Sequence, residues 1–136
     1  MVEIFETEED KNFSIGQLKH HYLQIARKNF QGKVYTNKET NKVIRVSKDG
    51  IMEWWRKSRK REHIISIQSL DSFLENSIFI NEYSDYLNRS KIISASLFES
   101  MCKINDKIFK VKIITRRSLY DIDKLRYYSL KNIEII

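Results

Sequence analysis

The sequence predicts an α+β domain in which N-terminal helices pack on one face of an antiparallel sheet. Apolar residues recur at helical spacing through the first half of the chain, whereas apolar and charged residues alternate in the last third. Helices followed by antiparallel strands are typical of domains whose helices cover one face of the sheet. The chain has 136 residues without an internal repeat or linker, which suits one domain with one core.

The clearest helix is predicted over residues 14–31. Ser14 and Gln17 have the spacing of a capping box, and Gly32 follows as the stop signal. His20 points away from the apolar stripe of this helix and His21 flanks it. Adjacent helical side chains diverge by about 100°, so the two histidines cannot share a metal ion and are predicted to be surface residues.

The apolar period changes after this helix. Residues 33–36 and 43–47 are predicted to be short strands on either side of a polar turn. A short helix is expected to begin at residues 51–55 and to run into a basic segment. A second apolar helical stripe covers residues 64–74 and ends near Asn76.

The last third of the chain predicts a β-hairpin. Residues 95–104 and 107–116 are the two strands, joined by the two-residue turn Asn105 and Asp106. Lys110 and Lys112 alternate with apolar residues, which predicts one buried face and one cationic face. Three further segments are expected to be a short extended piece, a polar loop and another strand, at residues 78–80, 83–91 and 125–135.

Charge is distributed unevenly along the chain. The 25 basic and 18 acidic residues give a net charge of +7, yet residues 1–10 hold five acids and no base. We therefore predict an acidic leader over residues 1–13 and a single basic domain over residues 14–136. The leader is either a disordered end or a strip that competes for the basic surface of the domain.

The cations form three clusters, within residues 56–61, 103–117 and 124–131. A single cluster of this kind can be a solvated face, but three in one small domain favour phosphate binding. Trp54 and Trp55 adjoin the first cluster, and because they point different ways on a helix, one is expected in the core and the other at the surface. The predicted nucleic-acid-binding residues are Arg56, Lys57, Arg59, Lys60, Arg61, Trp55, Lys110 and Lys112.

Composition excludes several kinds of site. The single cysteine, Cys102, rules out an internal disulfide and a cysteine-rich zinc site, and it is predicted to be a buried apolar residue. Glycine-rich phosphate loops are missing, and neither a metal nor a cofactor is predicted. No membrane span and no secretory signal are evident, so a cytoplasmic location is expected.

Several segments in order resemble a known group of proteins. They are residues 32–37, 43–47, 49–51, 67–77, 101–113 and 120–121. Together they are similar to the nuclease-like domains of phages and mobile elements in the barnase–EndoU–colicin–RelE superfamily, which occur in large polyvalent phage proteins and polymorphic toxins. The resemblance covers residues 14–136. It implies a fold of N-terminal helices packed on a four- or five-stranded antiparallel sheet, and metal-independent RNA cleavage in the active members. It also implies that the protein acts in the cytoplasm of the producing or target bacterial cell.

The same resemblance implies a set of catalytic residues. His63 stands where relatives carry a His or Lys, while Thr115, Arg116 and Tyr120 match positions after the hairpin. Cleavage to a 2′,3′-cyclic phosphate needs a base, an acid and cations that stabilise the phosphorane. His63 suits the base or acid, or it is a helix-start histidine hydrogen-bonded within the fold. Arg116 suits the phosphorane, Thr115 a hydrogen-bond donor and Tyr120 base stacking or proton donation.

Three functions remain open from the sequence. The first is an endoribonuclease, toxin-like or phage-borne, that cleaves tRNA or other structured RNA and has a cognate immunity or antitoxin protein as a partner. The second is a catalytically inactive relative that binds nucleic acid or protein as an accessory domain of a mobile element. The third is a basic inhibitor or adaptor protein that targets a host nucleoprotein. Cleavage of host RNA separates the first function from the other two.

Overall fold

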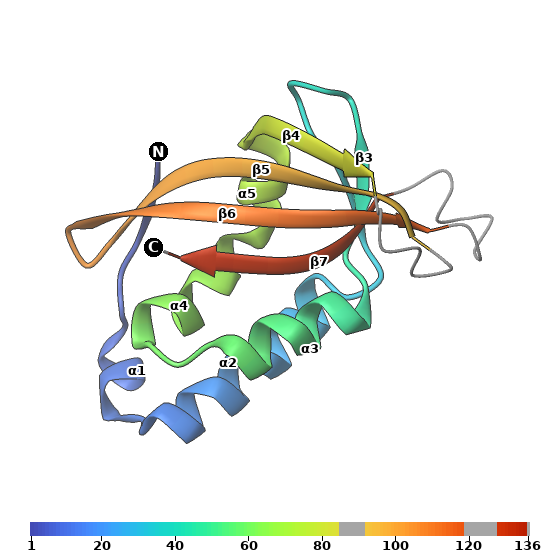
Figure 1. Ribbon diagram of the computed structural model, residues 1–136. Helices are drawn as coiled ribbons and strands as arrows, with labels where there is room; N and C mark the ends of the chain where they lie inside the picture. Colours follow the sequence, from blue (N-terminus) through green and yellow to red (C-terminus); the bar gives the residue numbers. More distant parts are fainter. Residues whose placement is uncertain (85–91, 119–127, 136) are drawn as a thin grey trace.

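The computed structural model describes residues 1–84, 92–118 and 128–135, and it confirms the α+β class. Helices pack on one face of a twisted mixed sheet (Figure 1). Within the described residues, seven strands form this sheet in the order β1-β5-β6-β7-β3-β2, with β4 beside β5. The strands are β1 (Val2–Ile4), β2 (Val34–Thr36), β3 (Val43–Arg45), β4 (Ile78–Ser84), β5 (Ile92–Ile104), β6 (Lys107–Ser118) and β7 (Tyr128–Ile135).

The centre of the sheet is antiparallel, as predicted, and runs β4-β5-β6-β7. Its margins are parallel: β1 pairs with the end of β5, and β3 pairs with β7. The hairpin turn lies where the sequence predicts it. Asn105 and Asp106 have φ values of 49° and 67°, and the two-residue turns that suit hairpin twist require positive φ at both positions.

The helices are α1 (Glu8–Asn12), α2 (Ile15–Asn29), α3 (Lys48–Lys57), α4 (Arg61–Ile65) and α5 (Leu70–Asn76). In α2 the capping box of Ser14 and Gln17 is present as predicted. The stripe at residues 64–74 is broken into α4, a 3₁₀ turn (Ser66–Ser69) and α5. The Ser66 hydroxyl donates to the His63 carbonyl at 2.7 Å, and such side-chain bonds compete with regular helix geometry.

The two faces of the sheet differ in what covers them. Val111, Ile113 and Thr115 alternate along β6 and are buried against the helices. The residues between them therefore point to the other face, because successive side chains of a strand alternate. This second face, called the open face below, carries Lys110, Lys112 and Arg116 on β6. The prediction of one buried and one cationic face is confirmed.

The first 13 residues are folded into the domain. Ile4 of β1 is 3% exposed and Asp10 of α1 is 2% exposed. Thr7 and Asp10 form a capping box for α1. The hydroxyl of Tyr22 donates to the Asp10 carboxylate at 2.7 Å, which joins this segment to α2. The acidic segment is therefore not a disordered end. Its Glu6 pairs with Arg61 of the first basic cluster at 3.4 Å, so the segment occupies part of the basic surface.

Replacing Tyr22 by Phe tests this junction. Burial first, and then the hydrogen bond to Asp10, raise the pKa of Tyr22 above its ordinary value of 10.0. The stabilisation that Tyr22 contributes is therefore complete below about pH 10. It declines above that pH, because Tyr22 then ionises in the unfolded state. We expect Tyr22→Phe to lower the unfolding free energy by about 2 kcal/mol at neutral pH. Urea unfolding should show this difference shrinking above about pH 10; a constant difference would contradict it.

Cys102 is fully buried on β5, as predicted. Burial raises the pKa of its thiol to about 11, so little thiolate forms at neutral pH. We expect a thiol reagent to label Cys102 only at the rate at which the domain opens, with full labelling in denaturant. Labelling of the native protein at the rate of a free thiol would contradict this burial.

Candidate nucleic-acid interface

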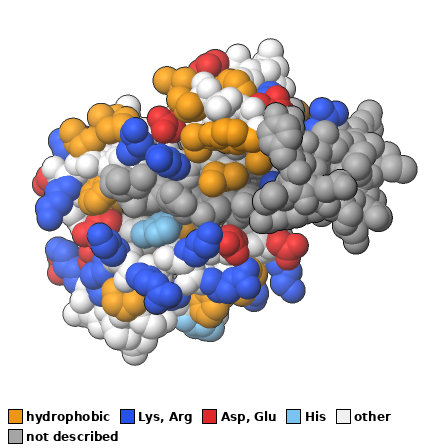
Figure 2. All heavy atoms as spheres, viewed as in Figure 1, with side chains coloured by type: hydrophobic (Ala, Val, Ile, Leu, Met, Phe, Trp, Pro, Cys, Tyr) orange, Lys and Arg blue, Asp and Glu red, His pale blue; other side chains and the backbone are white. Residues whose placement is uncertain are grey.

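The segment between α3 and α4 carries the densest charge of the sequence. α3 ends at a buried cap, where the Ser58 hydroxyl donates to the Trp54 carbonyl at 2.6 Å. Arg59 and Lys60 follow this cap and are exposed, and Lys60 is the N-cap of α4. Figure 2 shows Lys and Arg side chains gathered over the layer of α2 and α3.

Two of the predicted binding cations are neutralised within their own helix. Arg56 and Lys57 both pair with the carboxylate of Glu53, at 2.7 and 2.9 Å. The hydrogen bond from Lys57, followed by that from Arg56, holds the pKa of Glu53 below its ordinary value. These two cations also lie in the last turn of α3, where they offset the helix dipole.

Arg61 has a structural task that its sequence context does not reveal. Its guanidinium donates to the carbonyls of Phe13 and Asp10 and forms an ion pair with Glu6 at 3.4 Å. The side chain thus fastens the first 13 residues to α4. Because its donors are used inside the protein, Arg61 is not available to a ligand in the way that the sequence predicts.

Arg59 lies close to Lys19, a lysine of α2 that the sequence analysis did not single out. Lys19 of α2 lies over the ring of Trp55, with 4.7 Å between Nζ and the ring centroid. Burial first, and then the charge of Arg59, lower the pKa of Lys19. Within the described residues, Lys19, Arg59 and Lys60 form no ion pair with an acid. We call Lys19, Trp55, Arg59 and Lys60 the α3–α4 patch.

The two tryptophans divide as the sequence predicts. Trp54 is 0% exposed in the core, and its indole N–H donates to the His63 carbonyl at 3.3 Å. Trp55 is half-buried: its indole nitrogen is covered and has no hydrogen-bond partner among the described residues, while part of the ring stays exposed. Trp55 is therefore the tryptophan that belongs to the surface of α3.

The predicted catalytic residues do not form one cluster. His63 is half-buried in α4 within the helical layer. Thr115 is 0% exposed and faces the helices, whereas Arg116 follows it on β6 and so points to the opposite face. Tyr120 lies outside the described residues. A substrate on the surface cannot reach Thr115, nor can it contact Thr115 and Arg116 on one side of the sheet.

Lys110 and Lys112 belong to a different surface from the α3–α4 patch. Both are on β6 and point to the open face, as shown by the buried residues that alternate with them. Lys110 forms an ion pair with Glu99 at 3.7 Å. The third basic cluster, at residues 124–131, has no described side chains. The predicted binding residues are thus divided between the helical layer and the open face.

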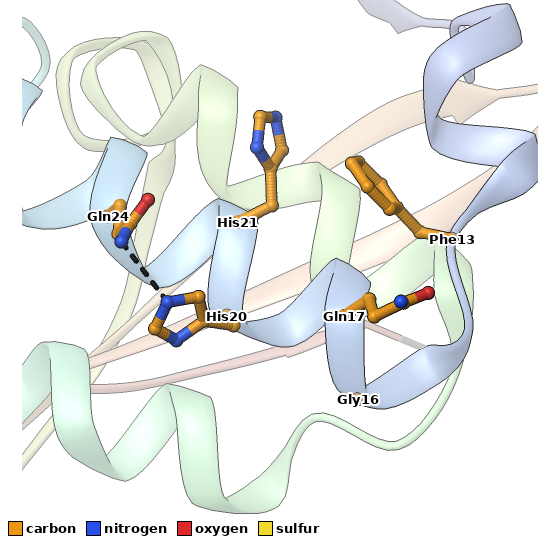
Figure 3. A pocket seen from close by; sticks show the side chains of 6 residues that line it. All are labelled: Phe13, Gly16, Gln17, His20, His21 and Gln24. Carbon is orange, nitrogen blue, oxygen red and sulfur yellow. Dashed lines mark hydrogen bonds between the residues drawn. The ribbon is translucent and has the colours of Figure 1, made fainter.

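His20 and His21 line a shallow hollow on α2 but point away from each other (Figure 3). His20 is exposed and lies 3.1 Å from the side-chain nitrogen of Gln24. His21 stacks against Phe13 with ring centroids 5.3 Å apart. The two side chains diverge as predicted, and His20 lies at the surface as expected, whereas His21 is half-buried.

Neither a metal site nor a membrane-spanning helix is found among the described residues. No group of three or more His, Cys, Asp or Glu side chains there is arranged to hold a metal ion. No described helix combines the length and the apolar character needed to cross a bilayer.

Comparison with known proteins identifies the family. Searches of curated proteins and of solved structures found no match to this chain. The model of one family, described as large polyvalent protein-associated domain 3, matches residues 14–128. That match covers most of the helical layer and the sheet, and it begins at the cap of α2. The chain therefore belongs to the large polyvalent protein-associated domain 3 family, a type of domain associated with phages and other mobile elements.

Proposed function

We propose that this chain is a nucleic-acid-binding accessory domain of a mobile element and that the α3–α4 patch contacts the phosphate backbone. The observation that carries the proposal is that Lys19 lies over Trp55 and close to Arg59, that Lys60 follows Arg59 in the chain, and that none of these three cations has an acidic partner among the described residues. Holding like charges together without a counter-ion is unfavourable, and a bound phosphate relieves that repulsion.

The composition of the patch suits a nucleic-acid backbone. Arg59 offers a guanidinium that grips two phosphate oxygens, while Lys19 and Lys60 act as point charges. Trp55 supplies an aromatic surface beside these cations, and proteins that bind single strands combine such rings with a basic groove. Because Arg56 and Lys57 are paired with Glu53, they add less to this surface than their charge suggests.

Ribonuclease activity is a second candidate, favoured by the position of His63. This half-buried histidine lies in α4 three residues after Lys60, which places the two residues about one helical turn apart. An imidazole close to a bound phosphate can exchange the protons that RNA cleavage requires. Binding is the better-supported function, because Thr115 is buried and Arg116 points to the open face.

One titration separates these functions. Fluorescence anisotropy of a labelled single-stranded RNA and a labelled DNA duplex is measured from about 50 to about 200 mM salt. We expect the affinity for both nucleic acids to fall steeply as the salt concentration rises. We also expect both to be recovered uncleaved. Absence of binding, or binding independent of salt, would contradict the proposal. RNA fragments with 2′,3′-cyclic phosphate ends, lost in His63→Ala, would establish the ribonuclease instead.

A further inference from the structure

α2 and α3 meet at two contacts in which a cation lies against an uncharged side chain. Lys19 lies over the ring of Trp55, 4.7 Å from its centroid. About two helical turns further along α2, the guanidinium of Arg27 donates to the sulfur of Met52 at 3.4 Å. A thioether is a weak acceptor, and Arg27 is exposed and forms no ion pair with an acid in the described part of the chain. Arg27 is therefore a second cation of α2 that α3 holds in place without neutralising it.

The two contacts define a basic row along the helical layer. Because the two cations of α2 contact α3 in reverse order along the chain, the helices run in opposite directions, as Figure 1 shows. The row runs from the α3–α4 patch, which includes Lys19, to Arg27, about 12 Å further along the axis of α2. We call the residues of this row the α2–α3 strip: Lys19, Arg27, Met52, Trp55, Arg59 and Lys60.

Acidic residues are few along the α2–α3 strip. Residues 15–29 and 48–65 hold nine Lys and Arg against three acids, and α2 itself has no acid. On α3, Trp55 projects about 60° to one side of Met52, whereas Asp49 and Glu53 project about 60° and about 100° to the other side. Glu53 is already paired with two cations of its own helix, and the third acid, Glu62, lies in the first turn of α4. The strip therefore keeps an excess of positive charge.

We propose that the α2–α3 strip binds single-stranded nucleic acid along its length, from Lys60 to Arg27. Successive phosphates contact the cations, and bases contact Trp55 and Met52. The proposal rests on the nucleic-acid-binding function proposed above. It adds to that function the class of nucleic acid and a fourth cation, Arg27.

The strip suits a single strand better than a duplex. Trp55 and Met52 are half-buried among the cations, so part of each side chain remains for a base. A single strand exposes the faces of its bases to such side chains, whereas a duplex stacks its bases inside and presents only their edges. The major groove of a duplex is about 12 Å wide and admits one helix, but α2 and α3 lie side by side (Figure 1).

The experiment measures the affinity of the full-length chain for labelled oligothymidines of about 2 to about 12 nucleotides by fluorescence anisotropy. We expect affinity to rise with length until the strip is covered, and a duplex of the greatest length to bind more weakly than the single strand. An abasic strand of that length should bind at least about fivefold more weakly, because it offers no base to Trp55 and Met52.

Two neighbouring variants locate the far end of the strip. Arg27→Ala should lower the slope of log affinity against log salt by about 0.7, which is about fivefold in affinity at roughly 0.1 M salt. Lys28→Ala is the matched control, because Lys28 is also exposed but projects from the side of α2 opposite Lys19. It removes the same charge and should change affinity by less than about twofold.

Several results would overturn the proposal. Equal losses in Arg27→Ala and Lys28→Ala would do so, because net charge rather than the strip would then govern binding. Affinity independent of length, an abasic strand that binds equally well, or a duplex that binds as tightly as the single strand would each do so too. All of these results leave the proposed function in place, since nucleic acid still binds, whereas absence of any binding would remove both. Thermal unfolding checks that Arg27→Ala is folded; Arg27→Gln repeats the test if it is not.

Discussion

Replacing Lys19, Arg59 and Lys60 together by alanine should weaken binding to a single-stranded oligonucleotide by about 100-fold at roughly 0.1 M salt. Each phosphate contact to a single strand contributes about 0.7 to the slope of log affinity against log salt. Losing three contacts therefore lowers the slope by about 2, which corresponds to that loss of affinity. Fluorescence anisotropy over a salt series measures both quantities.

The double variant Arg56→Ala and Lys57→Ala is the matched control for this result. It removes two cations from the same segment, but both are paired with Glu53 in the native protein. We expect a smaller change in the slope than the exposed cations produce. Equal effects for each cation removed would mean that net charge, rather than the α3–α4 patch, governs binding.

Removing residues 1–13 should destabilise the domain by about 4 kcal/mol or more. The truncation deletes β1 with its buried Ile4 and the carboxylate of Asp10 that Tyr22 contacts. It also leaves Arg61 without the carbonyls and the carboxylate that it binds. Since domains are stable by only about 5–15 kcal/mol, the truncated chain should unfold at much lower urea concentration.

Neighbouring single variants localise this effect. Arg61→Ala should lower the unfolding free energy by about 2 kcal/mol, because it removes the ion pair with Glu6 and the hydrogen bonds to the carbonyls of Phe13 and Asp10. Lys60→Ala, one residue away and exposed, should change stability by no more than about 0.5 kcal/mol. Similar stability of the two variants would contradict the structural task assigned to Arg61.

The local features of the fold are predictable because they depend on neighbours in sequence. The capping box of Ser14, the turn at Asn105 and the alternation along β6 each follow from a few adjacent residues. The pairings of β1 and β3 cannot be predicted in this way, because each strand has three residues and its partner lies far along the chain. Such short strands form only because the rest of the sheet is present.

The candidate site was only partly predictable for the same reason. Arg59 and Lys60 stand out as part of a basic segment. Arg61 belongs to the same segment and looks equivalent in the sequence, but its partners lie about 50 residues away. Lys19 belongs to α2 and reaches Trp55 through helix packing. A conspicuous density of charge therefore marks the region, whereas the roles of its cations depend on tertiary contacts.

The two indole N–H signals in a nitrogen-15 NMR spectrum test the interface most directly. The chain has two tryptophans, one in the α3–α4 patch and one in the core. When an oligonucleotide is added, we expect the Trp55 signal to shift and the Trp54 signal to stay in place. Amide shifts confined to the β5–β6 hairpin, with an unchanged Trp55 signal, would contradict the proposed interface.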